Sequence, residues 1–176
     1  MGIISFFEKK KNKEKFNNIY EEYYGTIFRR ISYLTGNSNV AEDLTQEVFI
    51  KLYNNPPSHE NVAAWLNKVS ANISYNYLRD NKIHQVKNEM IYENELDKVV
   101  LIEEIAMNKC EREEVRRVLD GLSLRDRMCL LLKFSGYKYA EIAEVVGVDK
   151  NSIGTIIARA QAKFKEAYLK VEKRGE

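Results

Sequence analysis

The residues with the clearest chemical capability lie close together near the C-terminal end of the chain. Side chains that carry positive charge or can donate a hydrogen bond occur here at Lys150, Asn151, Ser152, Thr155, Arg159 and Lys163. Lysine and arginine bind phosphate groups, and amide and hydroxyl side chains bond to phosphate oxygens or to the edges of bases. This set favours recognition of a nucleic acid over the making or breaking of a covalent bond.

The rest of the chain offers little that could support catalysis. His59 and His84 are isolated from any cysteine or carboxylate cluster with ligand spacing, and there is no glycine-rich phosphate-binding loop. Cys110 and Cys129 are nineteen positions apart, which matches no metal-ligand pattern. We therefore predict free thiols, no enzymatic activity, no cofactor and no metal.

The donors can share one face only if residues 139–164 fold as two helices joined by a tight turn. The inward positions of the second helix step by four, three and four residues: Ile153, Ile157, Ala160 and Phe164. Ala143 is small enough for a close crossing, and Gly147 can adopt the left-handed conformation of the turn. Val148 can fill the corner, and Asp149 can cap the next helix. The spacing predicts a helix-turn-helix, whose second helix enters the DNA major groove, although an ordinary helical hairpin has similar spacing.

Further helices are predicted upstream from apolar residues that recur every three or four positions. Three of them span residues 16–34, 40–55 and 62–82, and Pro56 and Pro57 end the second. In the C-terminal part, Ser123 can cap a helix, with Asp126 reaching back as in a capping box. We predict an all-α protein with two small helical domains, of which the C-terminal one is a helix-turn-helix.

Charge is distributed unevenly, although the net charge is only +2. Residues 1–15 carry five lysines and two glutamates, residues 85–115 carry nine acids and four bases, and residues 147–174 carry seven bases and three acids. An acidic segment between basic ends suggests two domains joined by a connector. The predicted parts are a basic extension (1–15), a first domain (16–82), a flexible acidic linker (83–108) and a second domain (109–172). No apolar run approaches the ~20 residues of a membrane span, so no membrane insertion is expected.

Three motifs, in this order, resemble those of bacterial RNA polymerase sigma factors of the small extracytoplasmic-function branch. They are AEDLTQEVFIKLY (41–53), WLNKVSANISYNYLRD (65–80) and YKYAEIAEVVGVDKNSIGTIIARAQAKF (137–164). The pattern A-E-D-x-x-Q-E-x-F in the first motif is the most specific, and the resemblance extends from about Phe16 to Tyr168. It implies a cytoplasmic protein that binds core RNA polymerase and directs promoter-specific transcription initiation, while the polymerase does the chemistry.

The resemblance also implies a role for each motif. The first would dock on a coiled coil of the polymerase through Asp43, Gln46 and Glu47, residues that form a plain solvated face in an unrelated protein. The second would open the promoter and read its −10 element through Asn72, Asn76, Arg79 and Lys82. The third would read the −35 element through the six donors named above. An inhibitory anti-sigma factor is an expected partner.

The chain departs from the family pattern at several of these positions. Relatives usually carry basic residues where this chain has Gly154, Ile156 and Gln161, so three phosphate or base contacts are expected to be absent. A glycine within a helix also costs about 1 kcal/mol relative to alanine. Asn76 stands where aspartate is frequent, which leaves the −10 sequence open.

Two other interpretations stay open at this point. A helix-turn-helix transcription regulator that does not bind core polymerase accounts for the C-terminal domain but leaves Ala41–Tyr53 unexplained. A helical adaptor without any role on DNA accounts poorly for the basic recognition face. Co-elution with core polymerase distinguishes them, because only a sigma factor requires that complex.

Overall fold

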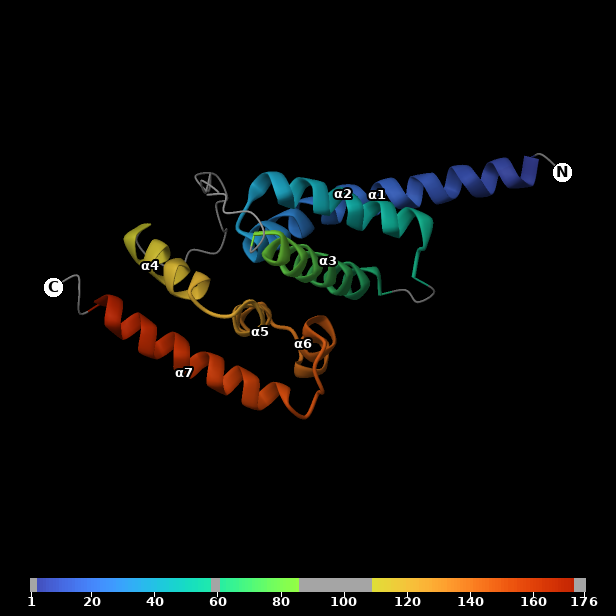
Figure 1. Ribbon diagram of the computed structural model, residues 1–176. Helices are drawn as coiled ribbons and strands as arrows, with labels where there is room; N and C mark the ends of the chain where they lie inside the picture. Colours follow the sequence, from blue (N-terminus) through green and yellow to red (C-terminus); the bar gives the residue numbers. More distant parts are fainter. Residues whose placement is uncertain (1–2, 58–60, 86–108, 173–176) are drawn as a thin grey trace. The chain divides into compact units, whose positions relative to one another are not determined.

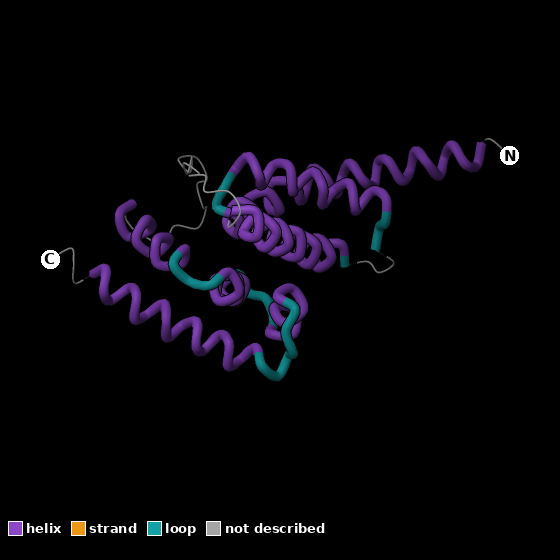
Figure 2. The backbone as a smooth tube through the Cα atoms, in the orientation of Figure 1, coloured by secondary structure: helices purple, strands orange, loops and turns teal. Residues whose placement is uncertain are grey.

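The computed structural model describes residues 3–57, 61–85 and 109–172, and within these ranges the chain forms helices and no strands. The helices, shown in Figures 1 and 2, are α1 (Ile3–Thr35), α2 (Ser38–Asn54), α3 (Val62–Gln85), α4 (Lys109–Asp120), α5 (Leu124–Phe134), α6 (Tyr139–Val146) and α7 (Ile153–Glu172). The predicted all-α fold is confirmed. None of the helices in the described ranges has the length and apolar character that crossing a bilayer demands. The predicted linker lies outside the described residues, apart from residues 83–85, which end α3.

A tight turn joins α1 to α2. Gly36 takes a φ of 72°, in the left-handed region, and its N–H donates to the Ser32 carbonyl at 2.8 Å. Asn37 caps α2, because its Oδ1 accepts the N–H groups of Asn39 and Val40 at 3.0 and 3.1 Å. A connection this short makes α1 and α2 antiparallel neighbours.

Apolar residues from the facing sides of α1 and α2 form the core of this hairpin. They are Ile27, Ile31 and Leu34 from α1, and Ala41, Leu44, Val48, Phe49 and Leu52 from α2. An edge-on contact between Phe16 and Tyr53, with ring centroids 5.3 Å apart, joins the two helices further out. α1 begins at Ile3 rather than at the predicted Phe16, so most of the basic extension continues the helix. Lysine and glutamate are good helix formers and give no stop signal there.

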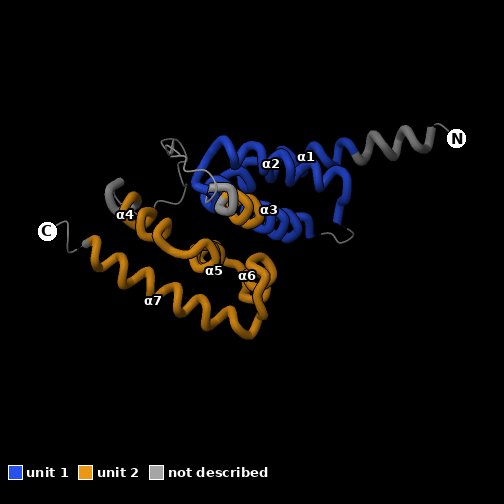
Figure 3. Tube along the Cα trace, viewed as in Figure 1, with its two compact units in different colours: residues 1–74, 92–99 blue, residues 75–91, 100–176 orange. Residues whose placement is uncertain are grey.

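α3 is continuous from Val62 to Gln85, and Asn61 caps it by accepting the Ala64 N–H at 2.9 Å. Figure 3 shows that the described residues form two compact units, the first ending at Ser74 and the second beginning at Tyr75. The division falls within this continuous helix. The domain boundary that the sequence places at residue 82 therefore stays a prediction.

Helices α4 to α7 enclose a separate core. Its fully or almost fully buried members are Met128, Cys129 and Leu132 from α5, Ile142, Ala143 and Val146 from α6, and Ile153, Ile157 and Ala160 from α7. Gly147 ends α6 with φ 68° and ψ 43°, and the Val148 N–H returns to the Ala143 carbonyl at 3.0 Å. This left-handed cap turns the chain from α6 into α7. The predicted helix-turn-helix is confirmed.

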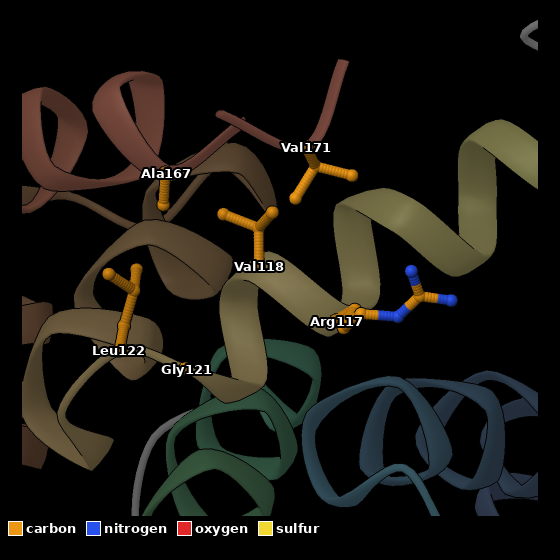
Figure 4. Close-up of a pocket in the computed structure, with 6 residues that line it drawn as sticks. All are labelled: Arg117, Val118, Gly121, Leu122, Ala167 and Val171. Atoms are coloured by element: carbon orange, nitrogen blue, oxygen red, sulfur yellow. The ribbon is translucent and has the colours of Figure 1, made fainter. Parts of the chain in front are cut away.

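A small hollow opens between α4 and the end of α7 (Figure 4). Its lining residues are Arg117, Val118, Gly121, Leu122, Ala167 and Val171. Val118 and Val171 point into the hollow, whereas the Arg117 guanidinium points away from it. These six residues do not provide the converging polar groups that are typical of a small-molecule site. Over the described parts of the chain, no three histidine, cysteine, aspartate or glutamate side chains are grouped so that they could hold a metal ion.

Candidate functional site

The turn between α6 and α7 is held by one aspartate. Asp149 Oδ1 accepts the Asn151 N–H at 2.7 Å, and the Asp149 carbonyl accepts the Ser152 N–H at 3.0 Å. The Ser152 carbonyl then accepts the Ile156 N–H at 3.0 Å, at the start of α7. Asp149 therefore organises the turn before α7 and presents Lys150, Asn151 and Ser152 at its N-terminal end, all three exposed.

Thr155 and Arg159 continue this exposed surface along α7. They lie one helical turn apart and are both exposed, whereas Ile153, Ile157 and Ala160 on the opposite face are buried. The structure thus brings five of the six predicted donors onto one continuous surface. Hydrogen-bond donors at the beginning of the second helix of a helix-turn-helix are well placed to reach base edges and phosphates.

The sixth predicted donor, Lys163, makes a different contact. Its Nζ lies 2.6 Å from Asp126 Oδ2, and the Asp126 side chain is only 6% exposed. Ser123 caps α5 by accepting the Asp126 N–H at 3.1 Å, as predicted, but the Asp126 carboxylate binds Lys163. The Lys163 ammonium therefore binds a carboxylate of another helix in the α4–α7 group.

Gly154 lies beside a tyrosine side chain whose position was not predicted from the sequence. A Cβ on Gly154 would stand 3.7 Å from Tyr139 Cε2, an ordinary van der Waals distance. Lys133 Nζ donates to the Tyr139 hydroxyl at 3.3 Å, so a lysine from α5 and a tyrosine from α6 meet beside the first turn of α7. One usable signal was present, since aromatic and basic residues stand at the start of α6 in Tyr137, Lys138 and Tyr139.

On α2, the predicted polar edge is present. Asp43, Gln46 and Glu47 are exposed, and Leu44 and Val48 face the core. Lys51 Nζ lies 3.3 Å from Glu47 Oε1, in an exposed pair one helical turn apart. An exposed pair of this kind stabilises the helix by only about 0.3–0.5 kcal/mol, so Glu47 is readily available to a partner.

Two large exposed side chains continue the α2 edge, and sequence reasoning missed both. Ile50 is 58% exposed and Tyr53 is 65% exposed. Ile50 follows directly after the buried Val48 and Phe49, which points it away from the core. Exposed apolar residues beside a polar edge are typical of a protein-binding surface.

The predicted α3 residues lie between the middle of that helix and its C-terminal end. Asn72 is partly buried, whereas Asn76 and Arg79 are exposed. Arg79 Nε donates to Asp80 Oδ1 at 3.0 Å in an exposed pair. Asn72 and Asn76 share one side of α3, because four residues make about one turn. The side chain of Lys82 lies outside the described residues.

Comparison with known proteins shows which family this chain is similar to. The model of Sigma-70 region 2 matches residues 19–83, and the model of Sigma-70, region 4 matches residues 112–164. Two similar proteins come from Bacillus subtilis (strain 168). The RNA polymerase sigma factor YlaC is 26% identical over 91% of this chain and 95% of its own length. The ECF RNA polymerase sigma factor SigM is 26% identical over 86% of this chain and 94% of its own length.

A solved structure has the same fold. It is the sigma factor RpoE in complex with the anti-sigma factor NepR from Bartonella quintana, with a TM-score of 0.62. The match covers 90% of this chain and 98% of that chain at 21% sequence identity. At that identity, the likeness concerns the arrangement of the backbone.

Proposed function

The chain belongs to the sigma-70 family, in its extracytoplasmic-function branch, and from this premise we propose how its helices divide the work of transcription initiation. It is an initiation factor that acts with RNA polymerase at specific promoters. The observation that carries the assignment is the ordered pair of family regions, one over α1–α3 and the other over α4–α7. A helix-turn-helix regulator without polymerase is not favoured, because it leaves region 2 unexplained.

The exposed edge of α2 is the proposed docking surface for core polymerase. Asp43, Gln46 and Glu47 supply acidic and amide groups that suit a basic partner surface, and Ile50 and Tyr53 supply apolar area beside them. Interfaces gain most of their affinity from such buried apolar anchors, while the surrounding charges set the orientation and speed of association. Leu44 and Val48 hold the edge in place from the buried side of the same helix.

The part of α3 from Asn72 onward is the proposed contact with the −10 element. Asn76 and Asn72 have amide groups that can bond to the edges of bases, and Arg79 and Lys82 can hold phosphates. Because the Arg79–Asp80 pair is exposed, little free energy is lost when Arg79 leaves Asp80 to bind a phosphate. This function does not require a catalytic group from the chain, since separating the strands needs only non-covalent capture of the opened bases.

The α6–α7 surface is the proposed contact with the −35 element. Asn151, Ser152 and Thr155 are candidates for base edges, and Lys150 and Arg159 are candidates for phosphates. Lys133 and Tyr139 lie beside the first turn of α7, so we add them as further phosphate donors. They stand next to Gly154, where the usual basic residue is missing.

An inhibitory protein partner is also proposed. The RpoE of Bartonella quintana is bound to the anti-sigma factor NepR in its solved structure. An inhibitor of this chain would cover the α2 edge near Asp43 or the α7 surface near Arg159, since either blocks initiation. Polymerase and promoter DNA place the working protein in the cytoplasm.

The direct test is co-elution of the purified chain with core RNA polymerase on a sizing column. A stable complex is expected, and its affinity should fall when the α2 edge is changed. If the chain binds duplex DNA but does not elute with polymerase, it is a DNA-binding regulator and not a sigma factor.

A further inference from the structure

One ion pair connects the first turn of α5 to the second half of α7. Lys163 Nζ and Asp126 Oδ2 are 2.6 Å apart, between residues 37 positions apart in the chain. The two side chains differ greatly in exposure, since Asp126 is 6% exposed and Lys163 is 59% exposed. The lysine therefore extends along the outside of α7 and brings its ammonium to a carboxylate that belongs to the core.

The buried carboxylate lies in two favourable electrostatic contacts. It lies in the first turn of α5, where the unpaired N–H groups of a helix favour negative charge. Lys163 supplies the opposite charge directly. Taking away the lysine leaves the buried Asp126 carboxylate without its partner, which costs more than losing one member of an exposed pair.

The same helix contains a pair of the exposed kind. Lys170 Nζ lies 2.7 Å from Glu166 Oε1, and both side chains are about 70% exposed, at 69% and 70%. This pair joins residues on one helix and fixes nothing between helices. The contrast indicates that the Asp126–Lys163 pair constrains how α7 packs on α5, which the Glu166–Lys170 pair does not do.

We propose that Asp126 and Lys163 form a positioning pair, which holds α7 in the orientation that presents Arg159 to DNA, and that Lys163 is not itself a phosphate contact. Lys163 is one helical turn after Arg159, so a shift of α7 at Lys163 moves Arg159 with it. The proposal deepens the proposed function, on which it rests, because it concerns the same −35 surface. It replaces the role that the sequence pattern predicts for Lys163.

Asp126→Asn tests the proposal by the sign of its effect on DNA affinity. If Lys163 leaves Asp126 to bind a phosphate, removing the acidic charge frees the lysine, and affinity for DNA rises. If the pair positions α7, the same change weakens the link to α5, and affinity falls several-fold. The assay uses the full chain and a duplex carrying the −35 half of a promoter selected by transcription from a random library.

Lys163→Met, made in an Arg159→Ala background, gives a second reading in the same assay across a salt series. If Lys163 binds a phosphate, this change lowers the slope of log affinity against log salt by a further ~0.9. If the pair acts by positioning Arg159, the slope of this background stays unchanged, because the contact that the pair positions is already gone. Lys170→Met is the matched control, because it removes the same charge from an exposed pair on the same helix.

Coupling to Arg159 separates a positioning role from a general loss of stability. In an Arg159→Ala background, Asp126→Asn should cost much less DNA affinity than in the parent chain, because the group that it positions is gone. Thermal unfolding of each variant shows whether the DNA effects simply follow stability. Arg159→Ala also tests the proposed function separately, since an unchanged affinity there would remove Arg159 from the DNA surface.

The outcomes are distinct. Lower affinity for Asp126→Asn, an unchanged slope for Lys163→Met in the Arg159→Ala background and coupling to Arg159 support the positioning pair. Higher affinity for Asp126→Asn, or a slope reduced by a further ~0.9 for Lys163→Met in that background, makes Lys163 a phosphate contact and overturns the proposal. Full additivity of Asp126→Asn with Arg159→Ala overturns it as well. If a variant does not fold, the other variant still decides.

Discussion

Gly154 on α7 lies beside the Tyr139 side chain on α6, and a Cβ added to it would meet Tyr139 Cε2 at 3.7 Å. That distance is an ordinary contact, and the left-handed glycines among the described residues are Gly36, Gly136 and Gly147. Nothing in the packing therefore requires a glycine at this position. We therefore expect a side chain placed at this position to change DNA binding without disturbing the packing.

Substitution of Gly154 should improve both stability and DNA affinity. Gly154→Ala should raise the free energy of unfolding by up to about 1 kcal/mol, because alanine loses less backbone entropy in a helix. Gly154→Lys should raise affinity for −35 DNA and steepen its salt slope by about 0.9, as expected for one added phosphate contact. Urea unfolding and duplex binding across a salt series measure the two effects. A less stable Gly154→Ala would show that Tyr139 cannot accommodate the methyl group.

Charge reversal on the α2 edge should disrupt polymerase binding without unfolding the protein. Asp43 is exposed, so Asp43→Arg should change the free energy of unfolding by less than about 0.5 kcal/mol. Affinity for core polymerase should fall by roughly tenfold or more, since attraction to a basic surface becomes repulsion. Glu21→Arg, an equal reversal at an exposed position on α1, is the control. Equal affinities for the two variants would remove Asp43 from the interface.

The −10 and −35 surfaces should fail in different ways. Asn76→Ala should reduce strand opening, seen by permanganate footprinting, and leave binding to duplex −35 DNA unchanged. Arg159→Ala should reduce duplex binding and lower its salt slope by about 0.9. Both residues are exposed, so neither change should unfold the protein. The same defect in both assays for both variants would contradict the division of work between α3 and α7.

Because of Cys129, the free energy of unfolding should depend on pH in the alkaline range. Burial, with the nearby Asp126 charge as a smaller cause, raises the pKa of this thiol from 9.0 to about 11. Because the pKa of the thiol is raised in the folded protein, the contribution of Cys129 to the free energy of unfolding is complete below pH 9. That contribution is lost as the pH rises toward 11. The free energy of unfolding should therefore fall more steeply over that range in the parent than in Cys129→Ala. Parallel slopes for the two proteins would mean that the thiol titrates equally in the folded and unfolded chains.

Local periodicity was enough to predict most of the helices and the turn between α6 and α7. The buried positions Ile153, Ile157 and Ala160 follow the three- and four-residue steps of the sequence, and Gly147 has the left-handed conformation expected at the turn. These features depend on residues that are close together in the chain. The effect of such residues on backbone conformation, and on which side of a helix is buried, is known. The start of α1 was predicted too late because lysine and glutamate fit a helix as well as they fit a solvated tail.

Contacts between distant residues could not be predicted in the same way. Asp126 has the spacing of a capping-box residue, and Lys163 occurs in a basic outward pattern, so each had a sufficient local explanation. Only the packing of α5 against α7 brings their charges to 2.6 Å. The exposure of Ile50 and the position of Tyr139 beside Gly154 likewise depend on which neighbouring helices cover a surface.

Transcription from a promoter library with purified core polymerase tests the central claim most directly. Core polymerase alone should give no defined start sites, and addition of the chain should give transcripts from a small set of promoters that share −10 and −35 elements. Asp43→Arg should lose these transcripts, and Glu21→Arg should retain them. Defined transcripts that appear without the chain, or none when it is present, would contradict its role as a promoter-specific initiation factor.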